Sequence, residues 1–139
     1  MKKITKILTT IAAILLLFSG CKKDDIRDKY IGDWDFVTEK TRYNNIPLES
    51  DTIYYLGKIS LGNLNEELVI KFTQDDEIIA SISDKVLYTD ITDYGKKYPC
   101  GHFERKDKVF IHLKWFIKDT NGNFDYYNIV GTKNERRQK

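Results

Sequence analysis

Histidine and cysteine, which commonly hold transition metals or take part in nucleophilic catalysis, are scarce in this sequence. It has two histidines, His102 and His112, and two cysteines, Cys21 and Cys100. Cys100-Gly101-His102 brings two types of metal ligand close together, but a structural zinc site needs four ligands. The sequence contains no Cys-x-x-Cys or His-x-x-x-His pair to supply the others. We therefore expect no metal site and no bound cofactor.

Catalysis by these residues is not indicated either. Cys100 and His102 are expected on similar sides of a strand, without the third group that would orient the histidine in a nucleophile pair. His-Glu-x-x-His, Gly-x-Ser-x-Gly and phosphate-loop motifs do not occur. The sequence predicts that the protein is not an enzyme. Cys100 is expected to be buried and inert, and pairing with a cysteine of another molecule is the alternative.

The residues before Cys21 have the pattern of a secretory signal. Lys2, Lys3 and Lys6 precede an apolar run of twelve residues, 7–18, and small residues follow at Ser19-Gly20. Because a helix needs about 20 apolar residues to cross a bilayer, this run is too short for a membrane span. We expect residues 1–20 to be a signal peptide that is cleaved.

The residues at the expected cleavage point indicate a lipid anchor. Leu17-Phe18-Ser19-Gly20-Cys21 resembles the lipobox of bacterial lipoproteins, although Phe18 stands where an aliphatic residue is usual. The resemblance implies that Cys21 is acylated and becomes the first mature residue. Two or three acyl chains, each contributing roughly 0.8 kcal/mol per buried methylene, would make the membrane attachment stable. Residues 21–29 are then a lipidated tether, and residues 30–139 form the folded domain.

The charged residues behind Cys21 bear on the destination of the protein. Lys22-Lys23-Asp24-Asp25 is similar to the acidic signal that exports some Gram-negative lipoproteins to the outer face of the outer membrane. Lys22 directly after the cysteine argues against retention in the inner membrane. We expect a lipid-anchored protein of the outer membrane. The alternative interpretation of the charges is a solvated polar connection between membrane and domain.

Composition agrees with a single small domain outside the cytoplasm. The chain has 139 residues, a mass of 16.3 kDa and 41% hydrophobic residues, which excludes a disordered tail. Its formal charge is +2, but removal of residues 1–20 takes away three lysines and no acidic residue, leaving −1. A nearly neutral exported domain has no basic stripe, so nucleic-acid binding is not expected.

From Tyr30 onward, apolar and polar residues alternate with the period of β-strands. In the first strand Trp34, Phe36 and Thr38 share one face, and Gly57 in the second marks a bulge or bend. The pattern predicts an all-β fold of about eight strands with short connections, an up-and-down barrel or a sandwich. The strands are expected at about 33–39, 52–61, 67–73, 78–83, 86–89, 102–105, 108–118 and 124–132.

The start of the first strand favours the barrel. Gly32-Asp33-Trp34 resembles the Gly-x-Trp motif of lipocalins and related calycins, in particular small lipocalin-like bacterial lipoproteins. In that family the tryptophan plugs the closed end of the barrel under a late basic side chain, a role that the resemblance gives to Arg136. Thr92-Asp93-Tyr94 is similar to the family's second motif. The alternative for Gly32 and Trp34 is an ordinary start of a strand.

An eight-stranded barrel is wide enough either to be filled by its own side chains or to hold one small ligand. We expect a small hydrophobic or amphipathic ligand, with lining residues Trp34, Phe36, Tyr55, Trp115 and Tyr126. Lys40 and Arg42 continue the face of Trp34 and either meet an anionic head group at the mouth or extend into solvent.

The alternative function belongs to a different class. It is a filled barrel that acts as a protein-interaction or inhibitor module, with an outward apolar patch at Phe110, Phe116 and Tyr127. A purely structural role in the envelope also remains open.

Overall fold

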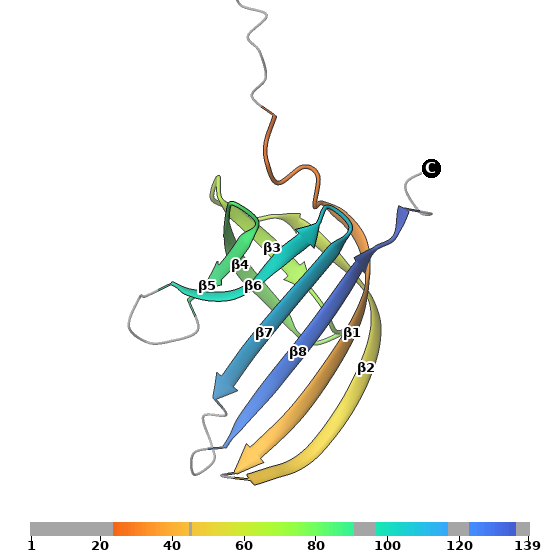
Figure 1. The fold of residues 1–139 in the computed structure, drawn as a ribbon, viewed down its shortest axis with the longest axis vertical. Coiled ribbons are helices and arrows are strands. Elements are labelled where there is room, and N and C mark those ends of the chain that lie inside the picture. The colour runs from red at the N-terminus through yellow and green to blue at the C-terminus, as the bar shows by residue number, and fades with distance from the viewer. Residues whose placement is uncertain (1–23, 45, 91–96, 117–122, 136–139) are drawn as a thin grey trace, which may run out of the picture.

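The computed structural model describes residues 24–44, 46–90, 97–116 and 123–135. Their strands form a closed antiparallel barrel in which each strand pairs with its neighbours in the sequence and β1 pairs with β8 (Figure 1). The prediction of an eight-stranded up-and-down barrel is therefore confirmed. The strands are β1 (Gly32–Asn44), β2 (Ile46–Leu61), β3 (Glu67–Lys71), β4 (Glu77–Ser83), β5 (Val86–Thr89), β6 (Tyr98–Arg105), β7 (Lys108–Phe116) and β8 (Phe124–Lys133).

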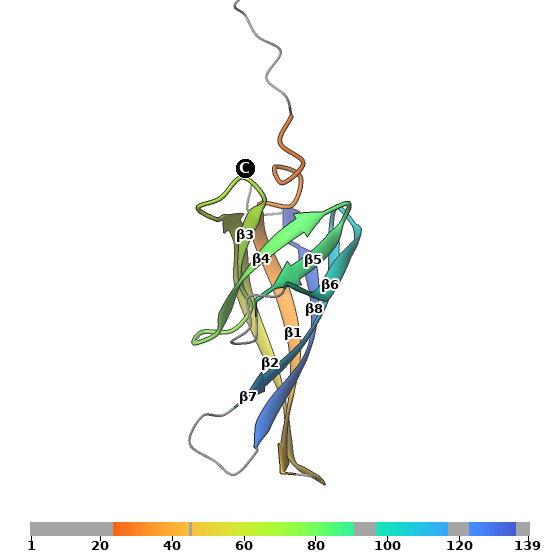
Figure 2. The same ribbon diagram turned by 90° about the vertical axis from the view of Figure 1, so that its left-hand side faces the viewer.

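The barrel is closed over only part of its height. Strands β3 to β6 are short, and β2 pairs with β3 only over residues 58–61, while β7 pairs with β6 only as far as Ile111. Beyond these points β2, β1, β8 and β7 continue together as an open four-stranded sheet (Figures 1 and 2). We call the fully paired part the closed section. The flared section comprises residues 38–44, 46–57, 112–116 and 124–128.

Aromatic and aliphatic side chains fill the closed section. The Trp34 ring lies 6.3 Å from Phe36 and 5.9 Å from Phe103, and Tyr30 stacks on Phe103 at 3.7 Å. All four rings are buried. Trp34, Phe36 and Phe103 occupy inward positions of β1 and β6, and Tyr30 comes from the turn before β1. The rest of the buried apolar core in this section is Ile59, Leu68, Ile70, Phe72, Ile78, Ala80, Ile82, Leu87, Cys100, Val109, Ile111 and Ile129. Leu113 and Tyr127 extend the core into the beginning of the flared section.

Two glycines make room for the Phe36 ring. A methyl group on Gly57 would overlap the Lys71 carbonyl oxygen and lie 2.8 Å from Phe36 Cδ2. A methyl group on Gly131 would lie 2.6 Å from both Phe36 Cε1 and Val109 Cγ1. Gly57 remains in regular register with β1, so of the predicted bulge or bend, the bulge is absent there. Its role is to admit a large ring into a narrow barrel.

The described part of the expected tether is folded against the closed section. Arg27 is buried, and Trp34 Nε1 donates a hydrogen bond of 2.9 Å to the carbonyl of Tyr30. The chain before β1 therefore forms a cap over the end of the barrel at which β1 begins, here called the closed end. Residues 24–29 thus belong to the folded domain, whereas residues 1–23 lie outside the described residues.

Replacement of Gly57 by alanine tests the tight packing around Phe36. We expect Gly57→Ala to lower the free energy of unfolding by about 1–3 kcal/mol, because overpacking a filled core forces neighbouring groups to move. Urea unfolding followed by tryptophan fluorescence measures the change. Thr52→Ala, at an exposed position of the same strand, is the matched control and should have little effect. Equal stability of both variants would contradict the packing described here.

Candidate functional site

The inner face of β1 changes from apolar to charged where the barrel opens. Trp34, Phe36 and Thr38 are buried, and Thr38 Oγ1 lies 3.5 Å from the Phe72 carbonyl oxygen at the edge of the core. Lys40 and Arg42 follow on the same face, in the flared section. The described strands therefore place two cations on an inner surface that is continuous with the core.

One carboxylate holds both cations. Lys40 Nζ lies 3.1 Å from Asp125 Oδ2, and Arg42 Nε donates to Asp125 Oδ1 at 2.9 Å. Arg42 Nη2 lies 3.3 Å from Asp125 Oδ2, which makes the guanidinium contact two-pronged. Asp125 is only 5% exposed, whereas both cations reach toward solvent. We call these three residues the charged cluster.

The charges of the cluster stabilise one another. Burial opposes ionisation of Asp125, but hydrogen bonds from Arg42 and Lys40, and their positive charge, hold its pKa below the usual value. Burial also opposes the charge of Lys40, yet hydrogen bonds to Tyr127 and Asp125 raise the pKa of its ammonium group. The hydrogen bond to Asp125 is the main reason that the pKa of Arg42 is raised. All three groups are therefore ionised at neutral pH.

Aromatic rings border the charged cluster on the side of the core. Lys40 Nζ lies 5.2 Å from the centroid of the Tyr127 ring, a cation–π distance. Phe72 meets Tyr127 edge-on at 5.9 Å, and Trp115 lies 6.4 Å from Tyr127 on the other side. Trp115 is 42% exposed, although it occupies an inward position of β7. The flared section thus presents a partly exposed indole beside two cations.

The turn between β3 and β4 closes the core next to this surface. Thr73 Oγ1 accepts hydrogen bonds from the backbone N–H groups of Asp75 and Asp76 and donates to Asp76 Oδ2 at 3.0 Å. Phe72, which directly precedes this turn, contacts the Tyr127 ring, so the turn lies close to that ring. Burial raises the pKa of Tyr127, its hydrogen bond with Lys40 lowers it, and the negative charge of Asp76 raises it. The turn therefore borders the flared section on the side of the core.

Two further acids share the inner face. In the pairing of β1 with β2, Lys40 is opposite Asp51 and Arg42 is opposite Glu49, and both acids are exposed. The charge of Glu49 contributes to the raised pKa of Arg42. Any head group that binds here therefore competes with these carboxylates for the cations.

The structure divides the expected lining residues into three groups. Trp34 and Phe36 are buried in the filled core, so neither borders the flared surface. Tyr55 is opposite Phe36 on the inner face and half-buried, and Trp115 is exposed in the flared section. Tyr126 faces outward, opposite the exposed Lys114, so its prediction as an inward residue is wrong.

The error at Tyr126 has a physical cause. Inward positions of β8 are Asp125, Tyr127, Ile129 and Gly131, so a carboxylate occupies the first of them. An acidic residue within a strand is normally assigned to the outer face. When Asp125 is assigned in this way, the inward and outward positions of the whole strand are exchanged. Tyr127, expected in an outward patch, is consequently a core residue. Ile129 could have indicated the correct phase, because it lies two residues after Tyr127 and residues two apart in a strand share one face.

The residues of the Gly-x-Trp motif occupy the closed end. Gly32 has a φ of 137°, a conformation that other residues rarely adopt, and Trp34 is fully buried. Arg136, Cys21 and Thr92-Asp93-Tyr94 lie outside the described residues. Phe110 is half-buried on the outer face, where Lys108 Nζ lies 4.8 Å from its centroid, and the side chain of Phe116 is not described.

Cys100 and His102 do not form a pair. The register between β5 and β6 shifts at this point, with Leu87 opposite Gly101 and Tyr88 opposite Pro99, so Cys100 is the extra residue of a bulge. Cys100 is buried, whereas His102 is exposed and stacks on Phe110 at 5.6 Å. Burial raises the pKa of the Cys100 thiol to about 11, which leaves it protonated and unreactive at neutral pH.

Comparison with protein-family models, curated proteins and solved structures finds no match to this chain. Within the described ranges, no three His, Cys, Asp or Glu side chains are grouped so that they could hold a metal ion. The same ranges include no helix with the length and hydropathy that a membrane span requires. The candidate site is therefore the charged cluster with its aromatic border, and it is identified from the arrangement of the side chains alone.

The charged cluster predicts an acid-dependent loss of stability. We expect Asp125→Asn to lower the free energy of unfolding at pH 7 by about 1–3 kcal/mol, between the values for exposed and buried ion pairs. The pKa of Asp125 is lower in the folded state than its unfolded value of about 3.9. Its contribution is therefore complete above that pH and disappears as the pH falls through the folded-state pKa.

Urea unfolding of wild type and Asp125→Asn between pH 7 and pH 3 measures this difference. Glu39→Gln, at an exposed position of β1, is the matched control and should follow wild type throughout. A difference between wild type and Asp125→Asn that persisted unchanged at the acid limit would show that charge pairing is not its source.

Proposed function

We propose that this chain is a lipoprotein of the bacterial outer membrane, anchored by acyl chains on Cys21, which binds a small amphipathic molecule in the flared section. The observation that carries the binding proposal is that Lys40 and Arg42 share one carboxylate beside an exposed indole. A polar head group can bind the cations while the apolar part lies on the exposed indole of Trp115. The sequence around Cys21 supports the anchor.

The packing of the closed section supports this location for the ligand. Phe36 fills the barrel between Gly57 and Gly131, and Phe72 packs against Tyr127. A ligand that entered the core would have to displace these rings. The flared section requires no such displacement, because its inner face is already open at Trp115 and Arg42.

The charges of the flared section limit the negative charge that a head group can carry, because Lys40 and Arg42 share the inner face with three carboxylates, Asp125, Glu49 and Asp51. Asp125 neutralises one of the two cations, and Glu49 and Asp51 face the same surface. A multiply charged anion would be repelled by these acids, whereas a carboxylate can accept hydrogen bonds from Arg42 and Lys40. The proposed ligand class is therefore a singly charged amphiphile such as a fatty carboxylate.

We infer a binding role and not a catalytic one. The three ionised side chains of the charged cluster are engaged with one another. The Tyr127 hydroxyl is hydrogen-bonded to Lys40, but its pKa is raised by burial, so it stays protonated at neutral pH. His102 and His112 are both exposed on the outer side of the barrel, away from this surface.

A second candidate function is favoured by a different observation. The filled core suits a protein-interaction or inhibitor module, and the outer face of β1 and β2 exposes Val37, Tyr54 and Leu56. Val37 and Tyr54 are direct partners in the strand pairing, so these side chains are contiguous. In this case the binding partner is a protein that covers the outer face, and the flared section takes no small ligand.

Titration with amphiphiles distinguishes the two candidates. Trp34 is fully buried, so dodecanoate binding in the flared section should change the emission of Trp115. We expect Arg42→Gln to weaken dodecanoate binding about tenfold, equivalent to about 1.4 kcal/mol. Lys58→Gln removes an exposed cation from the outer face and should bind as wild type does. Dodecanol should bind more weakly than dodecanoate, and failure of both to bind would favour the protein-interaction module.

Mass spectrometry of the intact protein purified from membranes tests the anchor. We expect a chain that begins at Cys21 and carries the additional mass of two or three acyl chains. Cys21→Ser should be released from the membrane fraction, since it lacks the thiol that is acylated. Retention of Met1, or an unmodified Cys21, would contradict the lipoprotein proposal.

A further inference from the structure

The closed end exposes apolar side chains that the barrel itself does not use. Ile26 is 48% exposed, Leu61 47% and Leu64 62%, and they come from the cap before β1 and the connection between β2 and β3. Leu61 is opposite the buried Leu68 and therefore stands at the rim of the closed end. Three large aliphatic side chains are thus presented to the surroundings at the same end of the molecule.

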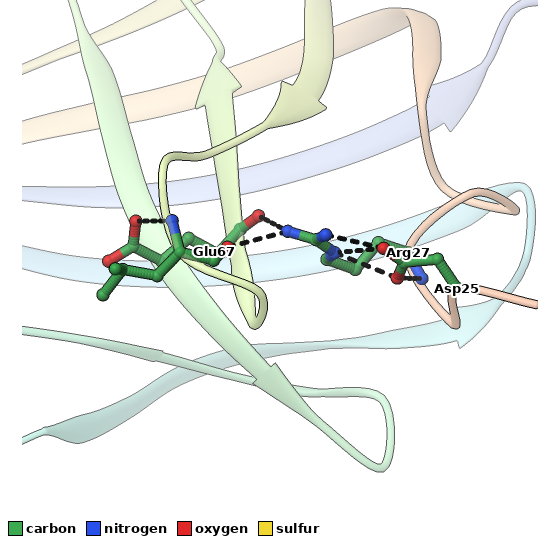
Figure 3. A network of polar contacts seen from close by, with 4 residues as sticks. Asp25, Arg27 and Glu67 are labelled. Carbon is green, nitrogen blue, oxygen red and sulfur yellow. Dashed lines mark hydrogen bonds and ion pairs between the residues drawn. The ribbon is translucent and has the colours of Figure 1, made fainter. Parts of the chain in front are cut away.

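Arg27 ties the two segments together, as Figure 3 shows. Its Nη1 donates to the carbonyl oxygens of Leu64 and Glu67, at 2.8 and 3.0 Å, and Gly62 N–H donates to the same Glu67 oxygen. The other side of the guanidinium binds the Asp25 carboxylate at 2.6–2.9 Å. These bonds hold the segments that carry Ile26, Leu61 and Leu64 in a fixed arrangement, although their side chains remain exposed.

The length of chain before Asp25 limits where this surface can be. Asp25 is four residues after Cys21, and four residues can span at most about 14 Å. With the acyl chains of Cys21 inserted in a bilayer, Asp25 must remain within that distance of the lipid head groups. The closed end, to which Asp25 is bound through Arg27, is therefore held against the membrane surface.

We propose that the closed end docks on the lipid bilayer, with Ile26, Leu61 and Leu64 inserted at the interface beside the acylated Cys21. This inference rests on the lipidation of Cys21 in the proposed function. Burial of apolar side chains at the interface adds to the attachment that the acyl chains provide. The short connection then joins two membrane-bound groups and does not act as a free linker.

The charges of the closed end indicate which kind of bilayer surface suits it. Asp28 and Glu66 are exposed near the apolar residues, as are Lys29 and Lys133 Nζ, which donates to the Lys29 carbonyl. These four groups are two acids and two bases, so they do not by themselves require an anionic lipid. Zwitterionic phosphatidylcholine is therefore the bilayer on which docking through the apolar side chains is tested.

The strand topology then fixes the direction of the flared section. β1 begins at the closed end and runs without interruption to Asn44, a length of up to about 43 Å for its 13 residues. Figure 1 shows the cap and the flared section at opposite ends of the molecule. Docking by the closed end accordingly directs the charged cluster and Trp115 away from the membrane.

Depth-dependent quenching tests this orientation in the intact, acylated protein. The protein is reconstituted in phosphatidylcholine vesicles whose acyl chains carry bromine, a quencher of indole emission. We expect Leu64→Trp to add an emission that loses most of its intensity in these vesicles relative to unbrominated ones. The native Trp115 signal, at the other end of the molecule, should be unaffected. Ile79→Trp is the matched control, because Ile79 is 54% exposed on the side of the barrel.

The outcomes separate the orientation from the anchor. An acylated protein that floats with the vesicles but shows equal quenching for Leu64→Trp and Ile79→Trp, or none, would overturn the docking of the closed end and leave the lipidation intact. Quenching of the Trp115 emission, recorded in a Trp34→Phe variant in which Trp115 is the only tryptophan, would also overturn it. An unmodified Cys21 in the intact mass would overturn both proposals.

Discussion

Hydrogen bonding between neighbouring strands closes this barrel only as far as its shortest strands reach. β5 has four residues and β3 has five, whereas β1 has 13 and β2 has 16. The long strands therefore lose partners on one side after the short ones end. This difference in length separates the molecule into a filled section and an open section. It also places the charged cluster at the boundary between them.

The same alternation of side chains has opposite consequences in the two sections. Inward residues of β1 are apolar where eight strands surround them, because a charge there would lose its hydration. Further along the strand the inward face meets water, and Lys40 and Arg42 are accommodated with Asp125 between them. Asp125 itself is almost completely covered, which explains why it has two cationic partners instead of one.

The fold class could be predicted from the sequence, because a period of two is a local property of each strand. Trp34, Phe36 and Thr38 were correctly assigned to one face, and the number of strands was correct. Long-range features were not accessible in this way. The inward Asp125 is explained only by its partners 85 and 83 positions away in the sequence, Lys40 and Arg42, so the phase of β8 was inverted.

The cap was missed for a related reason. Asp25 and Arg27 are charged residues near a signal sequence, and nothing local distinguishes them from a solvated connection. Arg27 is buried because the carbonyl groups of Leu64 and Glu67 accept its hydrogen bonds, and the connection between β2 and β3 brings them there. The extent of the flared section could not be predicted from the sequence either, because it depends on where the pairing of β3 with β2 and of β6 with β7 ends.

The unpaired edge of β2 affects how neighbouring copies behave when many are crowded in one plane. Free strand edges tend to pair with one another. With every closed end at the membrane, as proposed, the β2 strands of all copies run toward the lipid in the same direction. Two such edges can meet only in parallel, which sets Glu49 and Asp51 of each copy at the same height as their equivalents. Common orientation and like charge together therefore disfavour pairing of one β2 edge with another in a dense two-dimensional layer of these proteins.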